Sequence, residues 1–186
     1  MRPATFLSAS VPRIDRGLYH ETANPFLIQL AVRELVVAII RGRRLVWGGH
    51  PAITPMIRVV CESLDIDPGQ AVTLYQSEFF RAHFPPDNEI FEDVVITPAV
   101  ENDRCKSLLL MRSQMLSRND IDSAVFVGGM EGVEDEYDIF KYYHKDGIAI
   151  LLDAPGGAAR ELGNVHPDEK YVGVNFAGAF RSKLTV

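Results

Sequence analysis

Residues 123–132 read Ser-Ala-Val-Phe-Val-Gly-Gly-Met-Glu-Gly. The run from Ser123 to Val127 is almost entirely apolar, which is typical of a central parallel strand covered on both faces. The glycine pair after it permits a sharp backbone turn. Acidic residues follow at once, as they do in the first turn of a helix, where the helix dipole stabilises negative charge. The stretch therefore predicts a buried strand, a tight turn and a helix.

The same arrangement occurs earlier in the chain. Leu45-Val46-Trp47 leads into Gly48-Gly49-His50-Pro51, and a helix is expected from about Thr54 to Leu64. A helix that begins just after a glycine turn offers free N–H groups and a positive dipole end to an anion. Two such junctions predict a nucleotide-type site that is shared between two loops.

Strand and helix patterns alternate along the whole chain, which predicts an α/β fold with a mainly parallel sheet and helices on both faces. Ligands of such sheets bind at the carboxyl ends of the strands, near a switch in strand order. We expect residues 8–10, 48–50, 97–98 and 128–132 to converge there, within one domain spanning residues 1–186. Strands are predicted at 5–8, 45–47, 71–75, 94–97, 123–127, 148–152 and 171–176, helices at 26–40, 54–64, 103–116, 133–144 and 155–162, loops at 13–24 and 67–69, and a surface excursion at 78–93.

Composition limits the classes of partner. The 186 residues are 47% hydrophobic with a net charge of −6, so a core can form, and the acidic balance argues against a nucleic-acid partner. Apolar runs such as residues 35–40 are too short to span a bilayer, and the N-terminus has no signal-peptide pattern. Cys61 and Cys105 lack metal-type spacing and are interpreted as structural thiols of a reduced compartment. The expectation is a cytoplasmic protein with no membrane association, no metal and no cofactor.

The first two candidate loops offer small and polar groups. Ser8, Ala9 and Ser10 follow the first strand, where hydroxyls can donate to phosphate or ribose oxygens; the alternative is an ordinary turn in which serine bends the chain. Gly48 and Gly49 would let a ligand approach the main chain. His50 is a candidate ligand contact or a residue that satisfies local hydrogen bonds, and Thr54 is a candidate helix cap or phosphate contact.

The third candidate loop comprises Gly128, Gly129, Met130, Glu131 and Gly132, and Glu134, Asp135 and Glu136 follow it. One of these acids can reach a ribose hydroxyl or act as a base, whereas the others are helix-dipole charges. Arg112 lies in an otherwise apolar helix and is either a phosphate fork or a boundary residue that extends to water. No Walker A loop is present, and no Gly-x-Gly-x-x-Gly turn occurs at the first strand–helix junction.

Two glycine junctions with an acidic helix after the second resemble the SLOG superfamily of Rossmann-like domains, over roughly residues 5–152. LOG phosphoribohydrolases of that superfamily carry Pro-Gly-Gly-x-Gly-Thr-x-x-Glu, whose glutamate joins an arginine in cleaving an N-glycosidic bond. Here Val127 replaces the proline, Gly132 comes one residue late, and Val133 replaces the threonine. Glu136 is the best match for the family glutamate, and Arg112 resembles the family arginine without its neighbouring lysine.

The resemblance implies a Rossmann-like three-layer sandwich that is closer to the sensor-type members, among them domains of prokaryotic conflict and defence systems. It implies a nucleotide or nucleotide-derived ligand of ADP-ribose type, with Glu136 on ribose hydroxyls and Arg112 on phosphate. It also implies a homo-oligomer, with Phe79, Phe80 and Phe84 as a candidate surface. Two alternatives remain: a nucleotide N-glycosidic hydrolase that uses Glu136 and Arg112, and a protein-interaction scaffold whose glycines only permit turns.

Overall fold

A computed structural model describes residues 2–184. Its centre is a seven-stranded, all-parallel sheet with the order β4-β3-β2-β1-β5-β6-β7. The strands are β1 (Ala4–Ser10), β2 (Arg44–Trp47), β3 (Val72–Ser77), β4 (Asp93–Thr97), β5 (Ile121–Gly128), β6 (Ile148–Leu152) and β7 (Lys170–Tyr171). The α-helices are α1 (Tyr19–Thr22), α2 (Pro25–Ile39), α3 (Thr54–Ser63), α4 (Pro68–Ala71), α5 (Arg104–Leu116), α6 (Glu131–Tyr143), α7 (Gly157–Val165) and α8 (Phe176–Leu184), and two 3₁₀ helices are η1 (Glu78–His83) and η2 (Pro86–Ile90).

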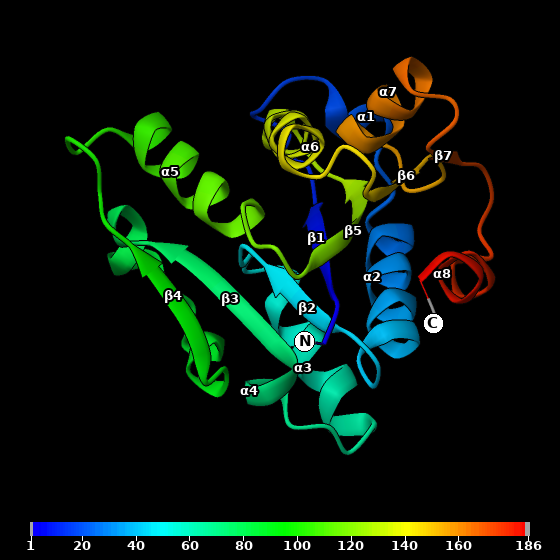
Figure 1. Ribbon diagram of the computed structural model, residues 1–186. Helices are drawn as coiled ribbons and strands as arrows, with labels where there is room; N and C mark the ends of the chain where they lie inside the picture. The colour runs from blue at the N-terminus through cyan, green and yellow to red at the C-terminus, as the bar shows by residue number, and fades with distance from the viewer. Residues whose placement is uncertain (1, 185–186) are drawn as a thin grey trace.

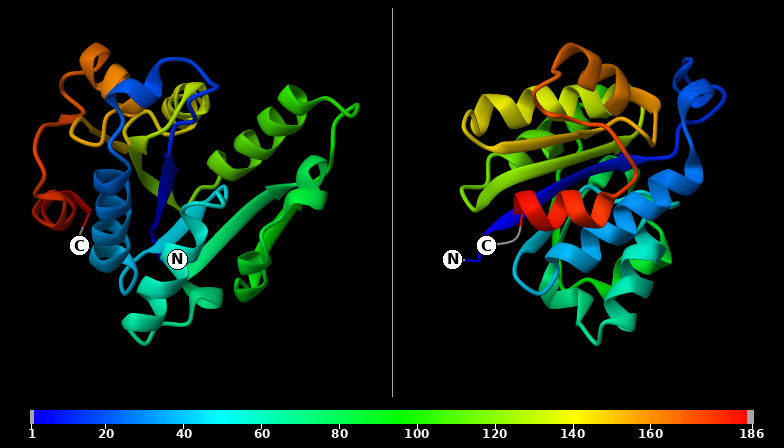
Figure 2. Two further views of the ribbon diagram at one scale, coloured as in Figure 1. Left: turned by 180° about the vertical axis from the view of Figure 1, so that it is seen from behind. Right: turned by 90° about the vertical axis from the view of Figure 1, so that its right-hand side faces the viewer.

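Helices cover both faces of the sheet, so the predicted parallel α/β sandwich is confirmed. Helices α5, α6 and α7 lie over one face, and α2, α3 and α8 lie over the other (Figures 1 and 2). Successive strand residues point to opposite faces, and the central strands show this directly. Phe6 and Phe126 pack beneath α5, α6 and α7, whereas Leu7 and Val125 pack against α2 and α8. All four side chains are at most 1% exposed, which explains why these strands are apolar on both faces.

Helix ends follow local capping chemistry. The Asn24 side chain accepts a hydrogen bond from the Leu27 N–H at 3.1 Å, with Pro25 as the first residue of α2. At the start of α5 the Asp103 side chain accepts from the Lys106 N–H at 2.8 Å. Each cap satisfies an N–H that has no partner within its helix.

The strand order reverses at β1. The chain proceeds outward from β1 through β2, β3 and β4, then returns to place β5 on the opposite side of β1. In open parallel sheets, ligands bind at the carboxyl ends of strands beside this switch point. The ends of β1 and β5 are therefore the expected location of a site.

Five sequence predictions differ from the structure. The strand predicted at 171–176 is only the two-residue β7, and α8 follows it instead; the loop at 13–24 contains the short helix α1, and the turn at 67–69 lies partly in α4. Segment 78–93 folds as η1 and η2, and Phe80 and Phe84 line a cavity. Helix α6 begins at Glu131, two residues before the predicted start, so Glu131 and Gly132 belong to its first turn.

Candidate functional site

The main cavity lies at the switch point and measures about 810 Å³. Residues 7–10, 47–51 and 76–77, at the ends of β1, β2 and β3, form its floor. Helices α5 and α6 and the 3₁₀ helix η1 form its walls. A volume of roughly 300–1,000 Å³ is usual for small-molecule and cofactor sites, so the cavity is large enough for a nucleotide.

A hydrogen-bonded charge cluster forms one wall. The Ser8 hydroxyl donates to Glu136 Oε2 at 2.5 Å, and Arg112 Nε donates to Glu136 Oε1 at 3.2 Å. Arg112 Nη1 also forms an ion pair with Asp135 Oδ2 at 2.7 Å. The structure thus brings together three residues that the sequence singled out from β1, α5 and α6, and it holds the guanidinium between two carboxylates.

Glu136 has an unusual protonation environment. Only 16% of its side chain is exposed. Burial raises the pKa of its carboxyl, and the Arg112 charge and the Ser8 hydrogen bond oppose this rise without cancelling it. Desolvation penalises the charged form of a carboxyl, so this group keeps its proton to a higher pH than an exposed glutamate does.

Gly132 gives Arg112 the space to reach these carboxylates. A Cβ atom at position 132 would lie 2.5 Å from Arg112 Nη2. Any larger residue at position 132 would therefore displace the Arg112 guanidinium. The position of the Arg112 guanidinium therefore depends on glycine at position 132.

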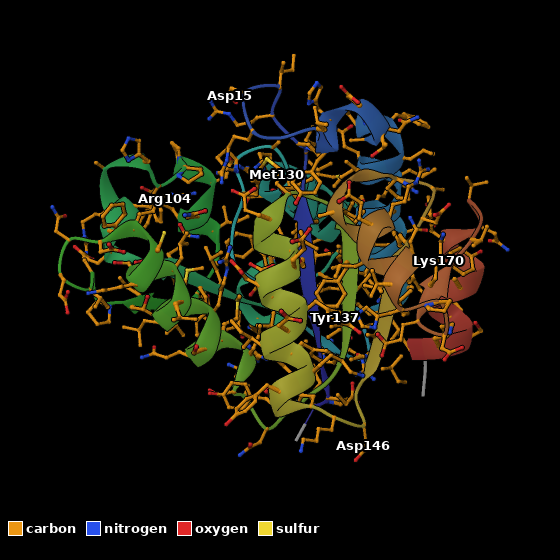
Figure 3. All side chains as sticks on the ribbon, turned by 90° about the horizontal axis from the view of Figure 1, so that it is seen from above. Asp15, Arg104, Met130, Tyr137, Asp146 and Lys170 are labelled. Carbon is orange, nitrogen blue, oxygen red and sulfur yellow. The ribbon has the colours of Figure 1, made fainter. Side chains whose placement is uncertain are left out.

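The start of α6 opens into the same cavity. Met130 is its N-cap and makes no side-chain capping bond, and Met130, Glu131 and Gly132 all line the cavity. Glu131 forms an ion pair with Arg16, which lies on the loop after β1 and also lines the cavity. Figure 3 shows this loop, marked by Asp15, close to Met130, with Arg104 at the start of α5 farther across.

The loop after β2 is internally hydrogen-bonded. The Ala52 N–H donates to His50 Nδ1 at 3.2 Å, and burial lowers the pKa of the His50 ring. A neutral ring whose Nδ1 accepts a hydrogen bond carries its proton on Nε2. His50 lines the cavity, and burial favours the neutral form of its ring.

Six of the residues singled out for the ligand site do not line the cavity: Thr54, Thr97, Pro98, Gly128, Gly129 and Glu134. The expected convergence of residues 97–98 with the other strand ends is therefore not seen in the cavity lining. Thr54 is fully buried, and its hydroxyl donates to the His50 carbonyl at 3.0 Å. Gly128 and Gly129 pack inside the protein: the Gly129 N–H donates to the Ser10 carbonyl at 2.9 Å, and a Cβ at Gly128 would lie 2.6 Å from Ile28. Ser8, Ala9, Ser10, Gly48, Gly49, His50, Arg112, Met130, Glu131, Gly132 and Glu136 all lie on the cavity wall.

Sequence reasoning missed the opposite wall. Phe80, Phe84 and Pro85 line the cavity from η1 and the residues after it, and Leu108 and Met111 line it from α5. Gln76 is fixed on the floor, where its Nε2 donates to the Gly48 carbonyl at 2.7 Å. The aromatic and proline-rich composition of residues 79–86 was the available signal, but only the fold shows that Phe80, Phe84 and Pro85 line the cavity.

Cys61 and Cys105 differ in environment. Cys61 is buried, and burial raises the pKa of its thiol to about 11. Cys105 is exposed and lines the cavity, so the interpretation of both thiols as structural residues applies only to Cys61. Within residues 2–184, no group of three or more histidine, cysteine or acidic side chains is arranged to hold a metal ion, and no helix combines the length and apolarity needed to cross a membrane.

Comparison with known proteins agrees with the fold. The X-ray structure of TM1055, a structural genomics target, superimposes with a TM-score of 0.59, covering 92% of this chain and 86% of that one. The two sequences are 14% identical, so this likeness concerns the fold. No curated protein matches the chain. Residues 18–184 match the SLOG cluster3 family, and the chain therefore belongs to this family of nucleotide-related binding or processing domains.

Proposed function

We propose that this protein is a sensor-type domain that binds a nucleotide or nucleotide-derived signal, with an ADP-ribose-type molecule as the leading candidate. The observation that carries the proposal is the 810 Å³ cavity at the strand-order switch, which joins an apolar wall to a charged wall. A nucleotide has a similar division, because its base presents flat aromatic faces that pack against apolar surface, whereas its ribose and phosphate are strongly polar.

The apolar wall suits the base. Phe80 and Phe84 supply aromatic surface, and Met111 adds an adaptable apolar contact. The His50 Nε2–H can donate to a ring nitrogen or a carbonyl oxygen of the base. These groups define one end of the proposed binding mode.

The charged wall suits ribose and phosphate. Glu136 can accept hydrogen bonds from ribose hydroxyls, and Ser10, at the end of β1, also lines the cavity. The first N–H groups of α6 have no partner within the helix and favour an anion. The proposed ligand therefore extends from the aromatic residues of η1 to the start of α6.

The environment of Arg112 does not favour a role in binding the ligand phosphate or in hydrolysing the ligand. Its guanidinium already faces Asp135 and Glu136, so one positive charge is balanced by up to two negative charges. Arg112 acts here as a support that orients Glu136. The phosphate is assigned to other groups.

A second function has one observation in its favour. A buried carboxyl whose pKa is raised is suited to general acid–base work, and burial raises the pKa of Glu136 in this way. Glu136 would then protonate or activate a group at the N-glycosidic bond of a nucleotide. Glu136→Gln separates the two functions, because a hydrolase loses base release while it keeps ligand binding, whereas a sensor releases no base in either form.

The experiment is a thermal-shift screen against nucleoside monophosphates, cyclic nucleotides, NAD and ADP-ribose, with chromatography of each mixture. A ligand at a hundred times its Kd adds about 2.7 kcal/mol to the free energy of unfolding. For a chain of this size that corresponds to a rise in Tm of roughly 5–11 °C. A rise in Tm with intact ligand supports the sensor, and release of free base supports the hydrolase. If no ligand raises the Tm and no base is released, the scaffold alternative is favoured.

The other expectations are tested separately. Self-association is measured by light scattering on the eluting protein, with and without ligand. Of the three phenylalanines proposed as a contact surface between copies, Phe80 and Phe84 line the cavity. Phe79 is therefore the member of the three to examine first as a contact between copies. A role in prokaryotic defence and a cytoplasmic location stay predictions until they are examined in the host cell.

A further inference from the structure

The cavity contains an ion pair that the proposed ligand would have to accommodate. Arg16, on the loop after β1, pairs with Glu131, the first residue of α6. Both side chains line the cavity, and they are 33% and 49% exposed. A partly exposed pair contributes little net stability, so its two members can exchange partners at little cost.

The three arginines that line the cavity are not equivalent. Arg112 is held between Asp135 and Glu136 and is only 14% exposed. Arg104 is exposed at the start of α5, across the cavity from α6. Arg16 is the cavity arginine that lies at the start of α6, and Glu131 is the carboxylate paired with it there.

Glu131 occupies the position that a ligand phosphate would favour. A carboxylate in the first turn of a helix is stabilised by the helix dipole, and the same field favours a bound phosphate. Since Arg16 contacts this carboxylate inside the cavity, a phosphate that replaced the carboxylate would meet the same guanidinium. Charge-assisted contacts from arginine to phosphate are strong and directional.

We infer that Arg16 is the residue that selects a phosphorylated ligand, and that Glu131 is an internal competitor which the ligand phosphate displaces from Arg16. This inference rests on the proposed function. The loop is anchored close by, because the Tyr19 hydroxyl donates to Glu134 Oε1 at 2.9 Å and the Gly157 N–H donates to the Thr22 hydroxyl at 3.0 Å. The exchange is thus confined to the loop tip around Arg16.

The two variants that test the inference have opposite expected effects. Arg16→Gln removes the phosphate contact and weakens binding of phosphorylated ligands about 10- to 100-fold, as expected for a hydrogen bond to a charged group. Glu131→Gln removes the competitor and tightens the same binding by up to about 5-fold, the scale of an exposed ion pair. Nucleosides, which lack the phosphate, bind both variants as they bind the wild type.

Calorimetry with ADP-ribose and the four ribonucleoside monophosphates, each compared with its nucleoside, gives the affinities. Arg13→Gln is the matched control, because Arg13 belongs to the same loop and pairs with Asp15 at 2.7 Å in an exposed position. It leaves all affinities unchanged. The substituted loop residues are partly or fully exposed, and an unchanged Tm without ligand verifies that each variant is folded.

The outcomes separate this inference from the proposed function. A wild-type protein that binds none of these nucleotides refutes the proposed function and the inference together. Nucleotide binding that is equally strong in Arg16→Gln and wild type refutes the inference alone, as does a Glu131→Gln variant that binds more weakly. If Arg104→Gln shows the selective loss instead, the phosphate lies at the start of α5 and the assignment to Arg16 is wrong.

Discussion

Gly157 is a position where one added methyl group should be costly. It has φ +64°, and a Cβ atom there would lie 2.8 Å from both the Gly128 carbonyl carbon and the Gly129 carbonyl oxygen. These are backbone atoms, so no side-chain rotation relieves the contact. For Gly157→Ala, the left-handed backbone costs about 1–2 kcal/mol and the overpacking a further 1–3 kcal/mol, which gives a total near 2–5 kcal/mol.

Urea unfolding followed by circular dichroism measures this loss. A decrease of about 3 kcal/mol lowers the Tm of a chain of this size by roughly 6–12 °C. The matched control is Gly42→Ala, where a Cβ atom would meet nothing within 4 Å. Its free energy of unfolding should stay within about 0.5 kcal/mol of the wild type, the range usual for surface substitutions.

The same variant reports on the site. The backbone that Gly157 contacts leads directly into Met130 and the start of α6, so its displacement should also weaken nucleotide binding. A Gly157→Ala protein with wild-type unfolding energy would refute the argument that this close approach positions the loop after β5.

Three further predictions concern buried groups. Burial raises the pKa of Glu136 above its ordinary value of 4.5, so its contribution to stability falls as the pH rises from 4.5 through the folded-state pKa. The stability of Glu136→Gln relative to wild type should therefore increase as the pH rises above 4.5, and a pH-independent difference in urea titrations would contradict this. Arg43 is 5% exposed and ties β1 to β5 through Thr5, at 2.8 Å, and Ser123, at 3.0 Å. Arg43→Met should lower the free energy of unfolding by about 2–4 kcal/mol through lost charge-assisted hydrogen bonds, and a loss below about 1 kcal/mol would contradict the assigned role. A thiol reagent should label one cysteine in the native protein, because Cys61 is buried with its pKa raised to about 11 and Cys105 is exposed. Cys105→Ser should abolish that labelling, bound nucleotide should slow it, and labelling of Cys61 in the native fold would be inconsistent with the packing.

The regular helices and strands could be predicted from sequence because the pattern of apolar residues along each segment indicates which of its faces are buried. Strand β5 alternates between two buried faces and is apolar on both, and α2 has a cap and a first-position proline. In the segment from 170 to 184, the local composition predicted the wrong secondary structure. Val172 and Val174 gave it a β-like composition, yet both are exposed, and Phe176 and Phe180 are buried as part of α8 instead.

The site was predictable in part for a related reason. Ser8, Arg112 and Glu136 were singled out separately, from a strand end, a helix and a family resemblance. Their direct contact depends on β1 and β5 being neighbours, which no local pattern specifies. The wall formed by Phe80 and Phe84 depends likewise on β3 lying beside β2, so its aromatic residues were interpreted as an outer surface.

The two glycine pairs, which look alike in sequence, have different uses because their strands have different neighbours. The end of β5 is enclosed by β1, α2 and the start of α7, so Gly128 and Gly129 permit close packing against Ser10, Ile28 and Gly157. The end of β2 borders the cavity: Gly48 and Gly49 line it, and a Cβ at Gly49 would lie 2.2 Å from Gln76 Nε2 on the cavity floor. A ligand can therefore approach the backbone after β2, whereas after β5 it meets the first turn of α6. In the proposed binding mode, the base end of the nucleotide lies over β2 and β3 and the anionic end lies at Arg16. The opposite effects expected of Arg16→Gln and Glu131→Gln follow from this proposed orientation.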